Sequence, residues 1–220
     1  MPRCVIFDCD GVLVDSEPIA CRVDAACLTQ AGLPISTEEI MARFVGMSSE
    51  SIVKILSAEH GVPVPADLDE MRRARIMAAF THELRPMPGV AAALRRIGLS
   101  KCVASSSHPE RIAHALGVTG LLDVFGDRLY SASMVARGKP APDLFLLAAE
   151  RMGAAPRDCI VIEDSVAGVT AGKRAGMAVF GFTGGSHCAS GHAERLRSAG
   201  ADRVFAWMFE LPALLEETVP

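Results

Sequence analysis

The chain has 220 residues, half of them hydrophobic and 22% charged, so it can bury a sizeable core and is not extensively disordered. Its 22 Lys and Arg against 26 Asp and Glu give a formal net charge of −4 with no basic block, which argues against a nucleic acid partner. The N-terminus lacks a signal peptide and no apolar run approaches the ~20 residues that span a bilayer, so we expect a cytoplasmic protein without a membrane partner.

The first predicted element is the apolar run Cys4–Phe7, which ends abruptly at Asp8-Cys9-Asp10-Gly11. A continuous apolar run of this length is typical of a strand buried in a parallel sheet. Residues 16–85 then contain no convincing strand and several helical patterns, one of which opens at Ser36 with Glu39 three positions on, the spacing of a capping box. We therefore expect a helical cap domain over residues 16–85, inserted directly after the first strand, where it can act as a lid.

Beyond residue 85, strand and helix patterns alternate. The expected strands are Cys102–Ala104, Cys159–Ile162 and Ala178–Phe180, and the expected helices are Val90–Ile97, Leu144–Met152 and Val166–Ala175, the second with Asp143 as its N-cap. This alternation favours an α/β core domain, residues 1–15 and 86–220, built on a doubly wound, Rossmann-like parallel sheet.

Polar side chains follow three of the predicted strands. Asp8 and Asp10 follow the first strand, Ser105 follows the second, and Glu163 and Asp164 follow the third. In open α/β sheets, ligands bind outside the carboxyl ends of the strands, so these side chains should share one edge. Carboxylates that converge there repel one another unless a cation lies between them. A hard cation with oxygen ligands is expected, and Mg²⁺ usually brings a phosphate with it.

A phosphoryl group at this edge would have a nucleophile and a proton donor beside it. Asp8 comes first after its strand and is placed to attack phosphorus, and Asp10 could protonate the leaving oxygen and later deprotonate the water. The hydroxyl of Ser105 and the ammonium group of Lys139 can hold phosphate oxygens. Any one of these features alone would indicate only a solvated turn, and an EF-hand loop is excluded because its twelfth position is Ile19 rather than Glu.

Four motifs in this order resemble those of the haloacid dehalogenase superfamily. They are Asp8-Cys9-Asp10-Gly11-Val12-Leu13-Val14-Asp15-Ser16-Glu17, Ser105, Lys139 within Lys139-Pro140-Ala141-Pro142-Asp143, and Glu163-Asp164-Ser165-Val166-Ala167-Gly168. Their order and spacing are similar to those of members with a small helical cap inserted after the first motif. The resemblance covers almost the whole chain.

The resemblance implies catalysis through an aspartyl-phosphate with Mg²⁺ as cofactor. Asp8 would be the nucleophile and Asp10 the general acid/base. Mg²⁺ would lie on the Asp8 carboxylate, the Asp10 backbone carbonyl and Asp164. Glu163 would be a further or water-mediated ligand, and Lys139 would also tie down the nucleophile.

The superfamily also contains dehalogenases, phosphonatases and phosphomutases. Asp10 argues against a dehalogenase, which typically lacks the second aspartate. Lys54, the lysine of the cap, is expected on a solvated helix face rather than as the Schiff-base lysine of a phosphonatase. A β-phosphoglucomutase carries a cap histidine and a cap arginine where this chain has Ala20 and Ser49, which argues against mutase activity. A phosphomutase is the alternative to a phosphatase.

The cap instead resembles sugar-phosphate phosphatases of the 6-phosphogluconate phosphatase type, through Arg43-Phe44-Val45-Gly46-Met47 and Glu59-His60-Gly61-Val62. We therefore predict a monomeric phosphatase whose partner is a small phosphorylated metabolite, such as a sugar or sugar-acid phosphate. A non-enzymatic binding module on the same fold is less favoured because all the catalytic positions are filled.

Substrate contacts are expected beside the second strand. The candidates are Ser106, Ser107 and His108, which directly follow Ser105. His108 equally suits the start of a helix ahead of Pro109, and both interpretations stay open.

The seven cysteines predict no disulfide framework, because the number is odd and no CxxC pair occurs. Cys9 is expected to pack with its strand, and the neighbouring carboxylates should raise the pKa of its thiol. His187, Cys188 and His192 lie in a Gly/Ser-rich segment but match no firm zinc pattern, so no second metal site is predicted there.

Overall fold

The structure, a computed structural model, describes residues 2–44 and 49–218. The chain divides into two compact units. The first, here called the core unit, comprises Met1–Asp15 and Arg85–Pro220; the second, the helical unit, comprises Ser16–Leu84. The Val45-Gly46-Met47 part of the cap resemblance and the side chain of Ser49 lie outside what the structure describes.

The core unit contains a six-stranded parallel sheet with the order β3-β2-β1-β4-β5-β6. Its strands are β1 (Cys4–Phe7), β2 (Ser100–Ser105), β3 (Leu129–Ser131), β4 (Cys159–Glu163), β5 (Ala178–Phe182) and β6 (Arg203–Phe205). This order confirms the doubly wound α/β fold, with the switch point between β1 and β4. Two short strands, β3 and β6, were not predicted, because three residues are too few to give a clear apolar run.

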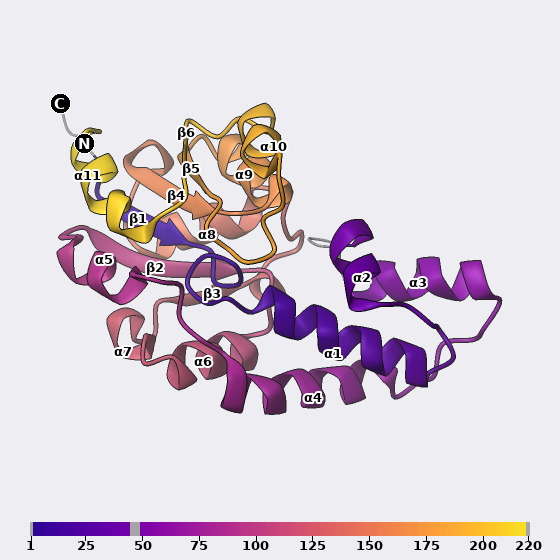
Figure 1. The fold of residues 1–220 in the computed structure, drawn as a ribbon. Helices are drawn as coiled ribbons and strands as arrows, with labels where there is room; N and C mark the ends of the chain where they lie inside the picture. Colours follow the sequence, from indigo (N-terminus) through magenta and orange to yellow (C-terminus); the bar gives the residue numbers. More distant parts are fainter. Residues whose placement is uncertain (1, 45–48, 219–220) are drawn as a thin grey trace. The chain divides into compact units, whose positions relative to one another are not determined.

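Helices cover both faces of this sheet (Figure 1). They are α5 (Val90–Arg96), α6 (Pro109–Val118), α7 (Leu122–Phe125), α8 (Asp143–Arg151), α9 (Val166–Arg174), α10 (His192–Ser198) and α11 (Leu211–Glu216), with the 3₁₀ turns η1 (Ala132–Met134), η2 (Pro156–Asp158) and η3 (Met208–Glu210). Along β1, Cys4 and Ile6 pack in a hydrophobic cluster with side chains of α8 and α9. Phe7 points to the opposite face, where its ring lies 6.1 Å from that of Phe125.

The expected N-cap of α8 is wrong. The helix begins at Asp143 itself, and the N-cap is Pro142. The Asp143 carboxylate instead accepts hydrogen bonds of 3.1 and 2.9 Å from Arg137. Two charge-assisted hydrogen bonds from an arginine stabilise this carboxylate more than one hydrogen bond from a backbone N–H of the helix would.

The helical unit consists of α1 (Glu17–Gln30), α2 (Thr37–Arg43), α3 (Ser49–His60) and α4 (Leu68–Glu83). Figure 1 shows α1 and α4 side by side, and a buried ion pair joins them: Arg72 donates to both carboxylate oxygens of Asp24, at 2.9 and 2.6 Å. The predicted capping box of α2 is confirmed, since Ser36 and Glu39 exchange hydrogen bonds of 3.1 and 3.0 Å. Lys54 is exposed, as expected.

No helix in the described part of the chain is long and apolar enough to cross a membrane.

Candidate active site

The switch point of the sheet brings two acidic segments together. Phe7 of β1 pairs with Ile162 of β4, and the next backbone N–H, that of Asp8, donates to the Ile162 carbonyl at 2.9 Å. Asp8 therefore leaves the sheet directly beside Glu163 and Asp164. All three carboxylates are buried, with exposures of 7%, 1% and 5%.

Lys139 lies between two of these carboxylates, those of Asp8 and Glu163. Its Nζ donates to Asp8 Oδ1 at 2.6 Å, to Glu163 Oε1 at 2.7 Å and to the Ala104 carbonyl at 3.0 Å, with a side chain only 4% exposed. Burial lowers the pKa of Lys139, but the negative charges of Asp8 and Glu163 raise it by a larger amount, so the net shift is upward. The lysine therefore stays protonated and holds the Asp8 carboxylate in place.

One ammonium group does not neutralise the whole cluster. Burial raises the pKa of Asp8 well above its ordinary range, and although Lys139 lowers it, the neighbouring carboxylates Glu163, Asp164 and Asp10 raise it again. Burial and Glu163 likewise raise the pKa of Asp164. Oxygen donors with this excess of negative charge suit a hard divalent cation.

Two glycines allow these carboxylates to approach the backbone. Gly11 has a φ of +78°, and a Cβ there would lie 1.9 Å from Asp164 Oδ2. A Cβ at Gly168, in the first turn of α9, would lie 1.7 Å from Glu163 Oε1. Glycine at position 11 lets Asp164 lie against the Asp8–Gly11 turn, and glycine at position 168 lets Glu163 lie against the start of α9. A cation could therefore be shared between the turn and Asp164.

Asp10 is held by two donors from the loop and helix that follow β2. The Ser107 hydroxyl donates to Asp10 Oδ2 at 2.7 Å, and Arg111 Nη2 donates to Asp10 Oδ1 at 2.9 Å. Arg111 was not among the residues expected at the site. It is the third residue of α6, the helix that follows the polar loop after β2, and that position was the available indication.

The predicted residues around Ser105 lie in different environments. Ser105 is buried, and its Oγ accepts a 3.1 Å hydrogen bond from the Ser107 N–H. Ser106 and His108 are exposed, and His108 is the N-cap residue of α6, followed by Pro109 at the first helical position. Their contact with substrate stays a prediction, as does the phosphate-binding role of Ser105.

Two histidines contact Asp164, one from the loop after β5 and the other from the first residue of α10. His187 Nε2 lies 3.0 Å from Asp164 Oδ2, and His192 Nε2 lies 2.6 Å from the Asp164 backbone oxygen. Burial lowers the pKa of His187, but the hydrogen bond to Asp164 raises it more, to about 11. No sequence argument connected them with Asp164, although β5 ends at the same edge of the sheet.

Comparison with known proteins agrees with this geometry. A sequence model of haloacid dehalogenase-like hydrolases matches residues 2–176. The chain belongs to the haloacid dehalogenase-like hydrolase family. A 6-phosphogluconate phosphatase of Escherichia coli K12 is 37% identical over 184 residues, which is 83% of each chain, and a hexitol phosphatase B of the same organism is 32% identical over 177 residues, 78% of this chain and 79% of the other. This haloacid dehalogenase-like chain is therefore a phosphatase.

Solved structures of haloacid dehalogenase-like proteins share the fold. One from Agrobacterium tumefaciens is 39% identical with a TM-score of 0.89, over the full length of both chains. A family hydrolase from Deinococcus radiodurans, crystallised with phosphate and sodium bound, is 36% identical with a TM-score of 0.80, over 98% of this chain and 96% of the other.

Proposed function

We propose that this phosphatase hydrolyses small sugar or sugar-acid phosphates with Mg²⁺ as cofactor, through a phosphoryl group carried on Asp8. The supporting observation is the position of Lys139, which bridges Asp8 and Glu163 at the carboxyl ends of two adjacent strands. A transferring phosphoryl group needs a fixed nucleophile and positive charge around its oxygens, and this arrangement supplies both.

In the first step, an Asp8 carboxylate oxygen attacks phosphorus and the bond from phosphorus to the leaving oxygen breaks. Lys139 holds Asp8 by one oxygen, Oδ1, which leaves the other free of that contact. Asp10 gives a proton to the leaving oxygen, and Ser107 and Arg111 orient its carboxyl group for that transfer. Ser105 and Lys139 would bind the phosphoryl oxygens.

In the second step, Asp10 takes a proton from a water molecule as that water attacks the phosphorus of the Asp8 acyl phosphate. The phosphorus–oxygen bond to Asp8 breaks, inorganic phosphate leaves, and both carboxyl groups return to their starting state. One residue acts first as acid and then as base, which is the usual requirement of a two-step transfer.

The carboxylates of Asp8 and Asp164 and the backbone carbonyl of Asp10 would hold Mg²⁺, with Glu163 as a further or water-mediated ligand. When bound, Mg²⁺ supplies positive charge for the phosphoryl oxygens and offsets the repulsion among the carboxylates. The upward pKa shifts of Asp8 and Asp164 support this assignment, because burial and the neighbouring carboxylates both disfavour the charged forms and a bound cation would offset that cost.

The substrate class rests on the relatives, whose names are those of a 6-phosphogluconate phosphatase and hexitol phosphatases. We propose a polyhydroxylated phosphate monoester of similar size for this chain, with the helical unit as the cap that selects it. We also propose that the protein is a cytoplasmic monomer, which sedimentation of the purified chain and fractionation of cells would check.

The test is phosphate release from 6-phosphogluconate, hexitol phosphates and hexose 6-phosphates, with Mg²⁺ or with chelator. Wild type should turn over at least one of them only with Mg²⁺. Asp8→Asn should lose at least about 10³-fold in kcat, because the nucleophile is gone. Asp123→Asn, an exposed acid in α7, is the matched control and should keep wild-type turnover.

Acid-quenched wild type should also carry one phosphoryl group on the peptide that contains Asp8, seen by mass spectrometry. Turnover that survives in Asp8→Asn would overturn the nucleophile assignment. Isomerisation of a sugar phosphate without net phosphate release, dependent on a bisphosphate activator, would show the phosphomutase alternative instead.

A further inference from the structure

A cluster of nitrogen and sulfur ligands lies next to the carboxylate site, in the loop after β5 and at the first residue of α10. The side chains of His187, Cys188 and His192 each offer one ligand atom, and these three atoms lie within 4.8 Å of one another. None of them has a part in the proposed hydrolysis. Their spacing along the chain matches no firm zinc pattern, and the fold of this segment is what brings the three side chains together.

We propose that His187, Cys188 and His192 form a binding site for Zn²⁺, distinct in ligand chemistry from the all-oxygen site beside it. Thiolate and imidazole ligands favour Zn²⁺, whereas carboxylate and carbonyl oxygens favour Mg²⁺. Two neighbouring sites of different softness can therefore hold different metals in the same chain.

The ligand spacing fits a tetrahedral zinc ion. With Zn–S of about 2.3 Å and Zn–N of about 2.0–2.1 Å, a sulfur and a nitrogen on one tetrahedral ion lie about 3.6 Å apart. Cys188 Sγ lies 3.5 Å from His187 Nε2. The rings of His187 and His192 are nearly perpendicular, at 81°, and their centroids lie 5.9 Å apart. The two imidazole nitrogens can therefore bind one ion from different directions. The fourth position would take a water molecule.

The surroundings of the cluster favour a bound ion. The His187 side chain is only 3% exposed, so an ion bound to it would be largely shielded from solvent. The Cys188 side chain is half-buried and lies against His187, so its sulfur can face an ion that the histidines also bind.

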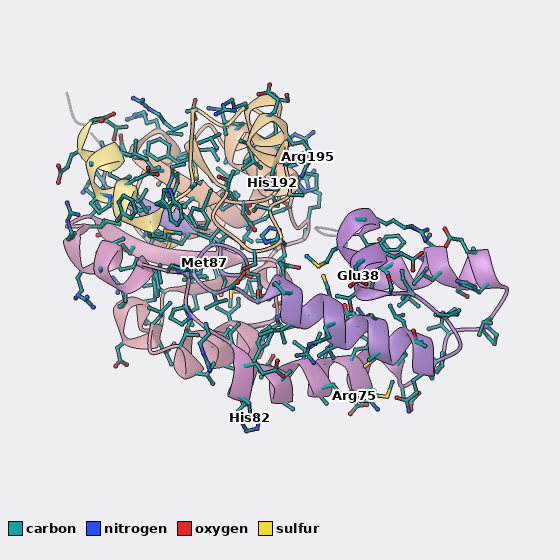
Figure 2. All side chains as sticks on the ribbon, in the orientation of Figure 1. Glu38, Arg75, His82, Met87, His192 and Arg195 are labelled. Carbon is teal, nitrogen blue, oxygen red and sulfur yellow. The ribbon has the colours of Figure 1, made fainter. Side chains whose placement is uncertain are left out.

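Both imidazoles now hydrogen bond to Asp164, and metal binding would replace those bonds. Arg195 Nη2 lies 3.0 Å from His192 Nδ1; Figure 2 shows these two residues as neighbours on α10. Since a guanidinium only donates, this places the His192 proton on Nε2. A zinc ion at Nε2 would move that proton to Nδ1 and displace the exposed Arg195. A zinc–thiolate or zinc–imidazole bond contributes more than a hydrogen bond does, and zinc would take the place of the proton that His187 shares with Asp164.

The test uses Co²⁺ as a spectroscopic stand-in for Zn²⁺, with the full chain reduced, freed of metal by chelator and then saturated with Mg²⁺. Wild type should bind one Co²⁺ per chain with a thiolate-to-cobalt absorption band in the near ultraviolet, and Zn²⁺ should bleach that band. Oxygen ligands give no such band, so Co²⁺ at the carboxylate site cannot imitate the result. The readout does not depend on phosphatase activity.

Cys188→Ala should abolish the band and Cys188→Ser should do the same, with folding checked by circular dichroism. Cys21→Ala, which removes a buried cysteine of α1, is the control and should keep the band. His192→Ala should weaken Zn²⁺ binding at least tenfold, measured by competition with a chromophoric chelator. Absence of the band in wild type, its survival in Cys188→Ala, or an unchanged Zn²⁺ affinity in His192→Ala would each overturn the proposal.

Discussion

Asp10 has its orientation set by residues about a hundred positions further along the chain. Ser107 and Arg111 each donate to a different oxygen of its carboxylate, at 2.7 and 2.9 Å. A general acid with a mobile side chain would spend little time aligned with the leaving oxygen. These two hydrogen bonds should therefore contribute to kcat rather than to substrate binding.

Arg111→Gln should therefore lower kcat about tenfold with little change in KM. A hydrogen bond to a charged group contributes about 1.5–3 kcal/mol, and the partly exposed guanidinium, 26% exposed, places the effect near the lower end. Steady-state kinetics on the best substrate would measure it. Arg137→Gln removes an exposed arginine that pairs with Asp143 and is the control. An unchanged kcat in Arg111→Gln would show that Asp10 needs no such support.

Cys188 differs from the other cysteines in both exposure and acidity. It is half-buried whereas the other six are buried, and the net effect of burial and the two histidines lowers the pKa of its thiol from an ordinary value of 9.0. A lowered pKa means that the thiolate is already present at a pH where an ordinary thiol is protonated.

In metal-free protein, iodoacetamide should label Cys188 first, and the rate should reach its plateau at a lower pH than for a free thiol. His187→Ala should move the midpoint back upward, because one of the two hydrogen bonds that favour the thiolate is lost. Peptide mass spectrometry across a pH series would measure both. A midpoint at or above that of free cysteine would contradict the expectation.

At the scale of elements, the first turn of α9 packs directly against the side chain of Glu163. Ser165 caps the helix by accepting from the Gly168 N–H at 3.0 Å, and the same serine donates to Glu163 Oε2 from its N–H and its hydroxyl, at 2.8 and 2.9 Å. The Glu163 carboxylate thus fills the volume above Gly168. Ser165 therefore fixes both the start of α9 and the position of the Glu163 carboxylate.

Gly168→Ala should lower the free energy of unfolding by about 1–3 kcal/mol, although alanine favours helices, because its Cβ would meet Glu163 Oε1 at 1.7 Å. Gly117→Ala in α6 is the matched control. A Cβ there meets nothing within 4 Å, so this variant should be about 0.5 kcal/mol more stable than wild type. Urea unfolding would compare them. Equal stabilities of the two variants would contradict the close packing of Glu163.

At the scale of the whole molecule, the parallel sheet gathers charge that the fold alone does not neutralise. Asp8, Glu163 and Asp164 are three buried carboxylates, and two cationic side chains contact them: Lys139 contacts Asp8 and Glu163, and His187 contacts Asp164. A cation that binds this cluster binds the folded core unit and not the unfolded chain, so it should raise the stability of that unit by mass action.

Mg²⁺ at about 100 times its Kd should add about 2.7 kcal/mol to the unfolding free energy of the core unit. For a unit of this size that corresponds to a rise in Tm of about 5–10 °C. Scanning calorimetry with Mg²⁺ or chelator would measure the rise, and Asp164→Asn should lose most of it. A rise of equal size in Asp164→Asn would place the cation elsewhere.

The sequence by itself determined the class of fold, the four motifs and the family. This was possible because β1, β2 and β4 are continuous apolar runs, each followed at once by polar residues, and because a parallel sheet aligns its carboxyl ends. Local hydrogen bonds could also be predicted where the partners are three residues apart, as in the capping box of Ser36 and Glu39. Such features depend only on neighbours along the chain.

The tertiary structure alone decided which side chains meet across the edge of the sheet. Arg111 reaches Asp10 from 101 positions away, and His187 lies against Asp164 from the loop after β5. Neither pairing has a local pattern, because it depends on strand order and loop path, which non-local packing sets. The cluster of His187, Cys188 and His192 has the same origin: spacing along the chain gave no zinc pattern, but the fold of the loop brings three soft ligands together.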